Sequence, residues 1–183
     1  DPTMSRGLGD VYKRQRCIIS LDFLFFNTIL YVCNIVRGKF MTKTAHLSKD
    51  NKIAFIALSN PPMNALSQGV RAGLRKSVEE ALSDNTIKAI VIHGDGNVFS
   101  AGADISEFHL PAIEPHLPDV CDLIEQSEKP VICAIHGFAL GGAFEIALST
   151  HFRIATKDAS VGLPEVHLGL LPGSAGTRKE RLG

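Results

Sequence analysis

Apolar residues along this chain fall into two kinds of pattern. Segments 52–58, 87–93 and 130–136 are short and nearly continuous apolar runs, typical of strands that are buried on both faces of a parallel sheet. Between them, apolar residues with helical spacing predict helices over 67–83 and 119–127. In the first of these helices Val70, Leu74, Val78 and Leu82 recur every four residues. Polar residues fill its other faces: Arg71, Arg75, Lys76, Glu79 and Glu80.

The remaining segments complete an alternation of strands and helices. Residues 140–149 open with two glycines and continue as a helix, and 152–155 and 159–162 are predicted to be short strands. Residues 109–118 are rich in proline, and residues 163–176 are rich in glycine and proline. Both stretches are predicted to be loops. Strands that alternate with helices predict an α/β fold with a largely parallel sheet.

The first 40 residues differ from the rest of the chain. Six basic residues stand against three acidic ones, and from Ile18 to Val36, 14 of 19 residues are apolar. One interpretation is a signal anchor, although Asp22 inside the stretch would cost about 2–3 kcal/mol near the centre of a membrane. The other is a non-native leader, because the opening DPTMSRGLGDVYKRQ resembles translated adapter sequence and the remainder resembles untranslated sequence read in frame. On that reading Met41 is the start and 41–183 is the domain.

Composition excludes several classes of protein. Lys and Arg number 19, as do Asp and Glu, and this zero net charge argues against a nucleic-acid binder. Four Cys without paired spacing argue against a disulfide scaffold or a zinc ribbon and favour buried thiols in a reducing compartment. Seven His without ligand spacing predict no metal site.

The passage from a strand through Gly141 and Gly142 into a helix is the strongest candidate for chemistry. The first N–H groups of a helix have no partner within it, and the helix dipole places partial positive charge there. Glycines allow a ligand to approach that backbone closely, which is the arrangement of an oxyanion hole. The alternative is a tight turn that needs glycine only for its backbone angles.

Two glutamates and one small-residue segment complete the candidate site. Glu145 has apolar neighbours in the predicted helix; an ionised carboxylate is costly to bury there, and such a setting suits a general acid or base. The alternative is a partly exposed Glu at a helix N-terminus. Glu165 follows a strand and a proline, where it is either catalytic or a solvated loop residue. In FSAGADI, 99–105, small residues allow a second backbone N–H to face a ligand, unless Asp104 only caps the following helix.

Three long motifs carry a resemblance to a known family. FSAGADI, KPVICAIHGFALGGAFEIAL and GLPEVHLGLLPGSAGT resemble the crotonase (enoyl-CoA hydratase/isomerase) superfamily in order and spacing. Within it, the chain looks most like the N-terminal hydratase/isomerase modules of peroxisomal bifunctional enzymes. The resemblance implies a crotonase-like α/β fold, a repeated ββα spiral, whose C-terminal helices would lie beyond Gly183. Those helices cover the acyl pocket and build trimers in many members.

The resemblance also implies roles for individual residues. Ala103 and Gly142 match the pair whose N–H groups bind the thioester oxygen, and Glu145 and Glu165 match the two catalytic glutamates. Other residues match segments that border the substrate and its coenzyme A moiety: Asn64, Ala65, Ala101, Gly102, Asp104, Ile105 and Gly141.

The expected function is enoyl-CoA hydration, the syn addition of water to trans-2-enoyl-CoA in fatty-acid β-oxidation. Isomerisation of a Δ3 to a Δ2 double bond is a second expected reaction of the same site. No cofactor is expected, and NAD only if a dehydrogenase module follows. The expected assembly is a homotrimer or a fused module, and the expected location is the peroxisome, with mitochondrion and cytoplasm as alternatives. The alternative function is a catalytically inactive binding protein or an inactive fragment.

Overall fold

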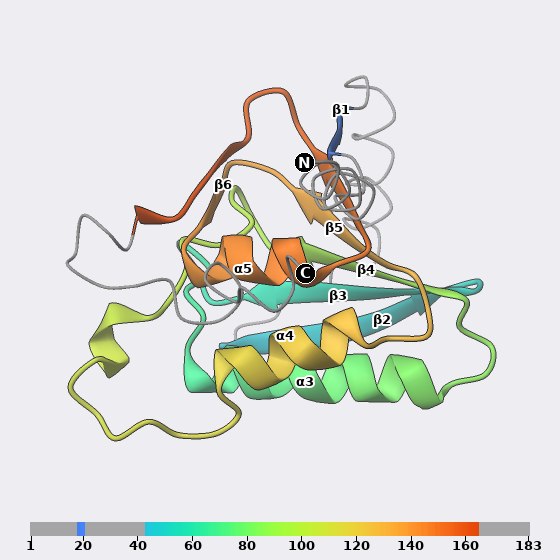
Figure 1. Ribbon diagram of the computed structural model, residues 1–183, viewed down its shortest axis with the longest axis horizontal. Helices are drawn as coiled ribbons and strands as arrows, with labels where there is room; N and C mark the ends of the chain where they lie inside the picture. The colour runs from blue at the N-terminus through green and yellow to red at the C-terminus, as the bar shows by residue number, and fades with distance from the viewer. Residues whose placement is uncertain (1–17, 21–42, 165–183) are drawn as a thin grey trace, which may run out of the picture.

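The computed structural model describes residues 18–20 and 43–164, and Figure 1 shows their arrangement around one twisted sheet. Six strands form this sheet, in the order β1-β7-β5-β4-β3-β2. In chain order the strands are β1 (Ile18–Ser20), β2 (Thr44–Asp50), β3 (Ile53–Ser59), β4 (Ala89–Gly94), β5 (Val131–Ile135) and β7 (Phe152–Ala155). Only the β2–β3 pair is antiparallel among the described strands, so the predicted α/β fold with a largely parallel sheet is confirmed.

The predicted buried strands form the middle of this sheet. β3, β4 and β5 have mostly buried side chains, as expected of apolar runs covered on both faces. Strand β2 was not predicted. It pairs with β3 through a tight turn at Asn51, whose positive φ of 53° suits asparagine.

Within the described part of the chain, three α-helices lie over the sheet and correspond to the predicted ones. They are α3 (Gln68–Ser83), α4 (Leu117–Glu125) and α5 (Gly142–Ser149). α3 packs against β2 and β3, and α4 contacts both α3 and α5 (Figure 1). The second helix begins two residues earlier than predicted because Pro118 lies in its first turn, where proline is tolerated.

A second, small sheet carries the loops that matter for function. β6 (Phe138–Leu140) pairs in parallel with β8 (Ser160–Gly162). An isolated bridge joins Ser100 to Ala139, so the segment around Ser100 lies along β6. Strand β6 was not predicted, and Leu140 is its last residue; the helix begins at Gly142, as the strand–GG–helix passage predicted.

Several expectations concern residues outside the described ranges. Apart from β1, which pairs with β7, the proposed leader lies there, so its origin and the domain boundaries stay predictions. Within 18–20 and 43–164, no helix has the length and apolar character that crossing a membrane requires. Cys121 and Cys133 are both buried thiols outside any disulfide, as the cysteine pattern predicted.

Candidate active site

The loop before Ala103 lies against the strand that leads into α5. The N–H of Ser100 donates to Phe138 O at 2.9 Å, and the N–H of Leu140 donates to Ser100 O at 3.2 Å. Gly102 has a φ of +93°, and a Cβ at this position would lie 2.5 Å from Leu140 O and 3.6 Å from Gly141 Cα. Only glycine therefore allows the two backbones to come this close.

Helix α5 opens with a backbone conformation that also requires glycine. Gly141 is the N-cap residue, with φ 53° and ψ −128°. Its carbonyl accepts the N–H groups of Phe144 and Glu145 at 2.8 and 3.0 Å. The N–H of Gly142 has no acceptor in the described part of the chain, as expected for the first residue of a helix.

Ala103 and Gly142, the two predicted oxyanion donors, come together at the same two leucines. Leu66 bridges to Ala103, and its N–H donates to Gly102 O at 2.8 Å. A Cβ at Gly142 would lie 3.5 Å from Leu66 Cδ1 and 2.5 Å from Leu117 Cδ2. Ala103 and Leu117 line one small pocket together with Leu66. No described group accepts the Ala103 N–H either.

Glu145 lies close to these donors and is buried. Only 3% of the residue is exposed, which fits the costly buried position and not the partly exposed alternative. Its Oε2 lies 3.9 Å from the Cβ position of Gly142, so the carboxylate is directed back toward the N-terminus of α5. The helix dipole favours negative charge at that end. The arrangement combines two N–H donors with one protected carboxylate.

The other predicted site residues take different places. Glu165 lies outside the described residues, and its role stays a prediction. Asp104 caps the short 3-10 helix η1 (Ile105–Glu107): its Oδ1 accepts the Ser106 hydroxyl at 2.6 Å and the Ser106 N–H at 3.0 Å. These hydrogen bonds hold the pKa of Asp104 below its usual value. Ile105 is 69% exposed.

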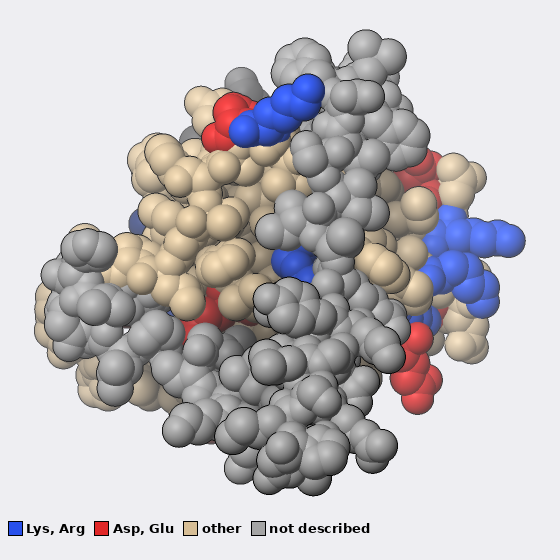
Figure 2. Space-filling model, turned by 45° about the horizontal axis from the view of Figure 1, so that its top comes forward, with Lys and Arg blue, Asp and Glu red and all other residues tan. Residues whose placement is uncertain are grey.

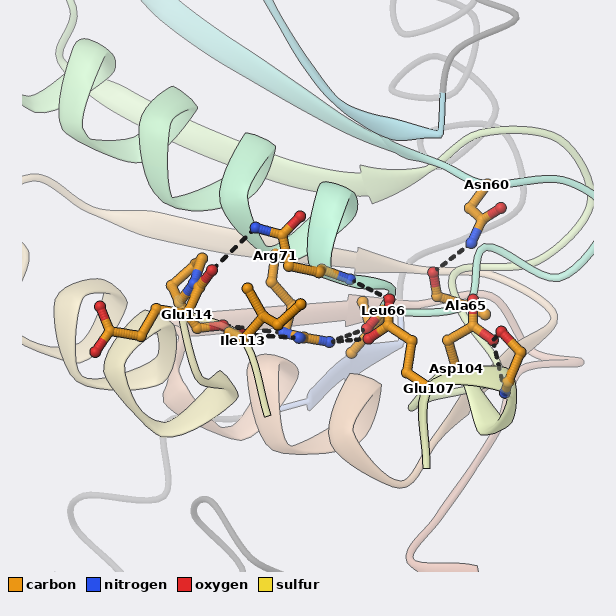
Figure 3. Close-up of polar contacts among 11 residues, drawn as sticks. Asn60, Ala65, Leu66, Arg71, Asp104, Glu107, Ile113 and Glu114 are labelled. Carbon is orange, nitrogen blue, oxygen red and sulfur yellow. Dashed lines mark hydrogen bonds and ion pairs between the residues drawn. The ribbon is translucent and has the colours of Figure 1, made fainter. Parts of the chain in front are cut away.

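Asn64 is committed to backbone groups inside the protein. Its amide nitrogen donates to Asp95 O at 2.6 Å and to Val98 O at 2.8 Å, and its side-chain oxygen accepts the Asn60 N–H at 3.1 Å. These bonds fix the turn that precedes the oxyanion loop. The nearby Ala65 carbonyl accepts the Asn60 side chain at 2.9 Å (Figure 3). The Ala101 N–H donates to Met63 O at 2.9 Å. Contact of these segments with coenzyme A stays a prediction.

Two adjoining pockets extend from Ala103. The larger has a volume of about 310 Å³ and the smaller about 120 Å³. Both are lined by Ala103, Arg71, Ala112 and Ile113, and the larger also contains Phe108, Leu110 and Pro111. The apolar residues of the 108–113 segment thus form one wall, next to the oxyanion donor.

Arg71 is a site residue that the sequence pattern did not single out. We expected it on a polar face of α3, but its side chain is only 15% exposed and lines both pockets. Its hydrogen bonds reach residues more than 30 positions away, so no local pattern could reveal them. The only sequence signal is a charged residue directly beside the apolar stripe at Val70.

Away from the pockets, Lys49 pairs with Glu80 at 3.4 Å and with Asp84 at 3.0 Å. On the face in Figure 2, positive and negative side chains form small separate groups among uncharged residues. Within residues 18–20 and 43–164, no three His, Cys, Asp or Glu side chains are grouped so that they could hold a metal ion.

Comparisons with known proteins agree with this geometry. Residues 48–180 match the family model described as Enoyl-CoA hydratase/isomerase. Over 127 residues, the chain is 52% identical to the peroxisomal bifunctional enzyme of Danio rerio. Over 140 residues, it is 41% identical to a probable enoyl-CoA hydratase of Bacillus subtilis. The matches cover 69% and 73% of this chain, but 18% and 54% of those relatives.

A solved structure supports the fold. The enoyl-CoA hydratase from Bacillus anthracis superposes with a TM-score of 0.69 at 30% identity, covering 76% of this chain and 57% of that one. The expected crotonase-like fold is therefore confirmed, as is the resemblance to the bifunctional enzymes. With its oxyanion loop, glycine-opened helix and matched family model, the chain belongs to the enoyl-CoA hydratase/isomerase family.

Proposed function

We propose that this chain forms the site of an enoyl-CoA hydratase, which adds water to a trans-2-enoyl-CoA and gives a 3-hydroxyacyl-CoA. The observation that carries the proposal is the close approach of Gly102 to Leu140 and Gly141. Ala103 follows Gly102 and Gly142 follows Gly141, so this close approach supports a pair of neighbouring N–H donors at these two residues, with buried Glu145 in the same helix as Gly142.

The two N–H groups act on the thioester carbonyl. When water adds to Cβ, negative charge moves onto the thioester oxygen, and donors fixed in advance stabilise that charge. One such donor contributes about 3–4 kcal/mol to lowering the barrier in other enzymes that use an oxyanion hole. Because both donors belong to the backbone, their geometry depends on glycine conformations and not on side-chain rotamers.

The two glutamates handle the proton and the water. The oxygen of water forms a bond to Cβ, its proton goes to a carboxylate, and Cα receives a proton. We assign Glu165 as the main proton donor at Cα and Glu145 as the residue that orients and activates the water, as the family resemblance implies. Proton transfer by Glu165 alone would shift a Δ3 double bond to Δ2. Neither reaction is a redox step, so the proposal includes no cofactor.

The relatives support a wider setting. We propose that the chain is the hydratase module of a longer peroxisomal enzyme of fatty-acid β-oxidation. Relatives with this module are named peroxisomal bifunctional enzyme, and the match covers 18% of the Danio rerio protein. Sequencing the complete transcript tests this setting, because a dehydrogenase module downstream would support it and a stop soon after the hydratase domain would not.

Crotonyl-CoA hydration by the full-length protein tests the activity. Glu145→Gln and Glu165→Gln should each lower kcat at least about 100-fold, since a positioned acid–base group contributes about 10²–10⁴-fold. Glu79→Gln, on an exposed face of α3, is the matched control and should retain activity. Isomerisation of a 3-enoyl-CoA should fail with Glu165→Gln. Full hydration by both site variants, or no turnover by the wild type, would overturn the proposal.

A further inference from the structure

Arg71 joins helix α3 to the loop that forms the apolar wall of the pocket (Figure 3). Its Nη1 donates to Leu66 O at 2.7 Å and to Glu107 Oε2 at 3.1 Å. Its Nε donates to Pro115 O at 3.0 Å, and its Nη2 donates to Ile113 O at 3.3 Å. One side chain therefore holds both ends of the wall.

Gln68, in the first turn of α3, repeats this connection. Its N–H donates to Glu107 Oε1 at 2.7 Å, and its Nε2 donates to Glu114 O at 2.9 Å. Glu107 thus uses both carboxylate oxygens on α3, one of them at an N–H that the helix leaves unpaired. Residues before and after the 108–113 segment are fixed to the same turn of the helix.

The segment between these two attachments presents apolar groups. Phe108, Leu110 and Ile113 are 53%, 56% and 55% exposed and line the pocket of about 310 Å³. Exposed apolar side chains on a pocket wall favour an apolar ligand. Ala103 opens onto the same space, so an alkyl chain attached to a thioester at Ala103 would extend along this wall.

The guanidinium group of Arg71 is occupied by these contacts. Arginine has five N–H groups, and four are directed at the acceptors named above. Its charge is balanced by Glu107. This excludes a simple phosphate-binding role and leaves a structural task at the pocket.

We propose that Arg71 is a positioning residue for acyl-chain selection. It holds residues 108–113 as a preformed wall, and long enoyl chains depend on this wall while the four-carbon crotonyl group does not reach along it. The proposal rests on the proposed hydratase function. Without Arg71, a long-chain substrate must order the wall itself, which weakens its binding.

Steady-state kinetics of the full-length protein test this selection. For Arg71→Met, we expect KM for trans-2-decenoyl-CoA to rise about tenfold, with kcat and the KM for crotonyl-CoA changed less than about threefold. Arg71→Lys keeps the positive charge opposite Glu107 but lacks the branched guanidinium group. Its KM for trans-2-decenoyl-CoA should therefore lie between those of the wild type and Arg71→Met. Glu107→Gln removes the charge that pairs with Arg71, so it should raise the KM for trans-2-decenoyl-CoA by less than Arg71→Met does. Arg75→Met is the matched control, because Arg75 pairs with Glu79 on the same helix at 2.9 Å and lines neither pocket.

Binding without turnover separates this proposal from the proposed function. In Arg71→Met, calorimetry should show about a tenfold loss of affinity for decanoyl-CoA and no comparable loss for butyryl-CoA. A wild type that does not hydrate crotonyl-CoA but shows this split would refute the hydratase proposal and support the wall. Equal effects on both chain lengths, or none on either, in an active and folded protein would overturn the role of Arg71.

Discussion

Replacing Gly102 by alanine gives the most direct test of how the two oxyanion donors are positioned. A Cβ at this residue would lie 2.5 Å from Leu140 O, whereas ordinary contacts begin near 3.4 Å. The backbone of the oxyanion loop, the segment that leads to Ala103, must therefore move away from β6 by about 0.9 Å. Ala103 follows directly, so its N–H should move by a similar amount relative to Gly142.

A displacement of this size should be costly for catalysis. A misplacement of about 1 Å costs about 10²-fold in rate, and loss of one oxyanion donor costs about 10²–10³-fold. We expect Gly102→Ala to lower kcat for crotonyl-CoA hydration about 100-fold in the full-length protein. The reaction is measured as the loss of absorbance of the conjugated thioester. The positive φ should also cost about 1–2 kcal/mol of stability.

Gly96→Ala is the matched control. Gly96 also has a positive φ, 78°, but a Cβ there has no atom within 4 Å. Both variants carry the backbone penalty, and only Gly102→Ala carries the contact with Leu140. If a folded Gly102→Ala retains activity within about twofold of Gly96→Ala, the close approach does not position the donors, and the reasoning is refuted.

Three further predictions concern residues around the site. Asn64→Asp removes the donors to two buried carbonyl groups and should lower the free energy of unfolding by about 2–4 kcal/mol in urea titrations, whereas exposed Asn85→Ala should change it by less than about 0.5 kcal/mol. Burial raises the pKa of the Cys133 thiol, so Cys133 and buried Cys121 should react with iodoacetamide only on unfolding, as peptide mass mapping would show; rapid labelling of the native protein would contradict this. The folded-state pKa of Asp104 is lowered, so its stabilisation is full above its unfolded value of about 3.9 and is lost as the pH falls through the folded value. The stability advantage of wild type over Asp104→Asn should therefore be constant above about pH 5 and shrink as the pH falls below about 3.9, and an advantage independent of pH would disprove this account.

The elements found from sequence are those whose pattern is set by local burial. The helix predicted over 67–83 is observed over 68–83, with Val70, Leu74 and Val78 on its buried face. The pair of glycines correctly indicated the start of a helix at Gly142, and the apolar neighbours of Glu145 are consistent with its burial. In each case the residue and its cause lie within a few positions of one another.

Elements missed from sequence either lie at an exposed edge of the sheet or owe their structure to distant partners. Strand β2 lies at the edge of the sheet and has mostly half-exposed or exposed side chains, so TAHLSKD shows no continuous apolar run. Strand β6 has three residues and pairs with β8, about 20 positions later. The sequence pattern predicts Arg71 as a surface residue of α3, whereas in the structure its side chain binds the loop at Pro115. No local periodicity records such long-range pairings.

Leu66 contacts both the oxyanion loop and Arg71, the residue that holds the pocket wall. Its N–H bonds to Gly102 O at 2.8 Å, and its carbonyl accepts Arg71 Nη1 at 2.7 Å. Its side chain is 1% exposed and lies against Gly142 at the start of α5. Because Leu66 is held by Gly102 and by α5 as well as by Arg71, the close-packed interior keeps it in place when Arg71 is replaced. Arg71→Met should therefore act on the pocket wall and leave the kcat for crotonyl-CoA little changed, whereas Gly102→Ala acts directly on the oxyanion loop and lowers kcat.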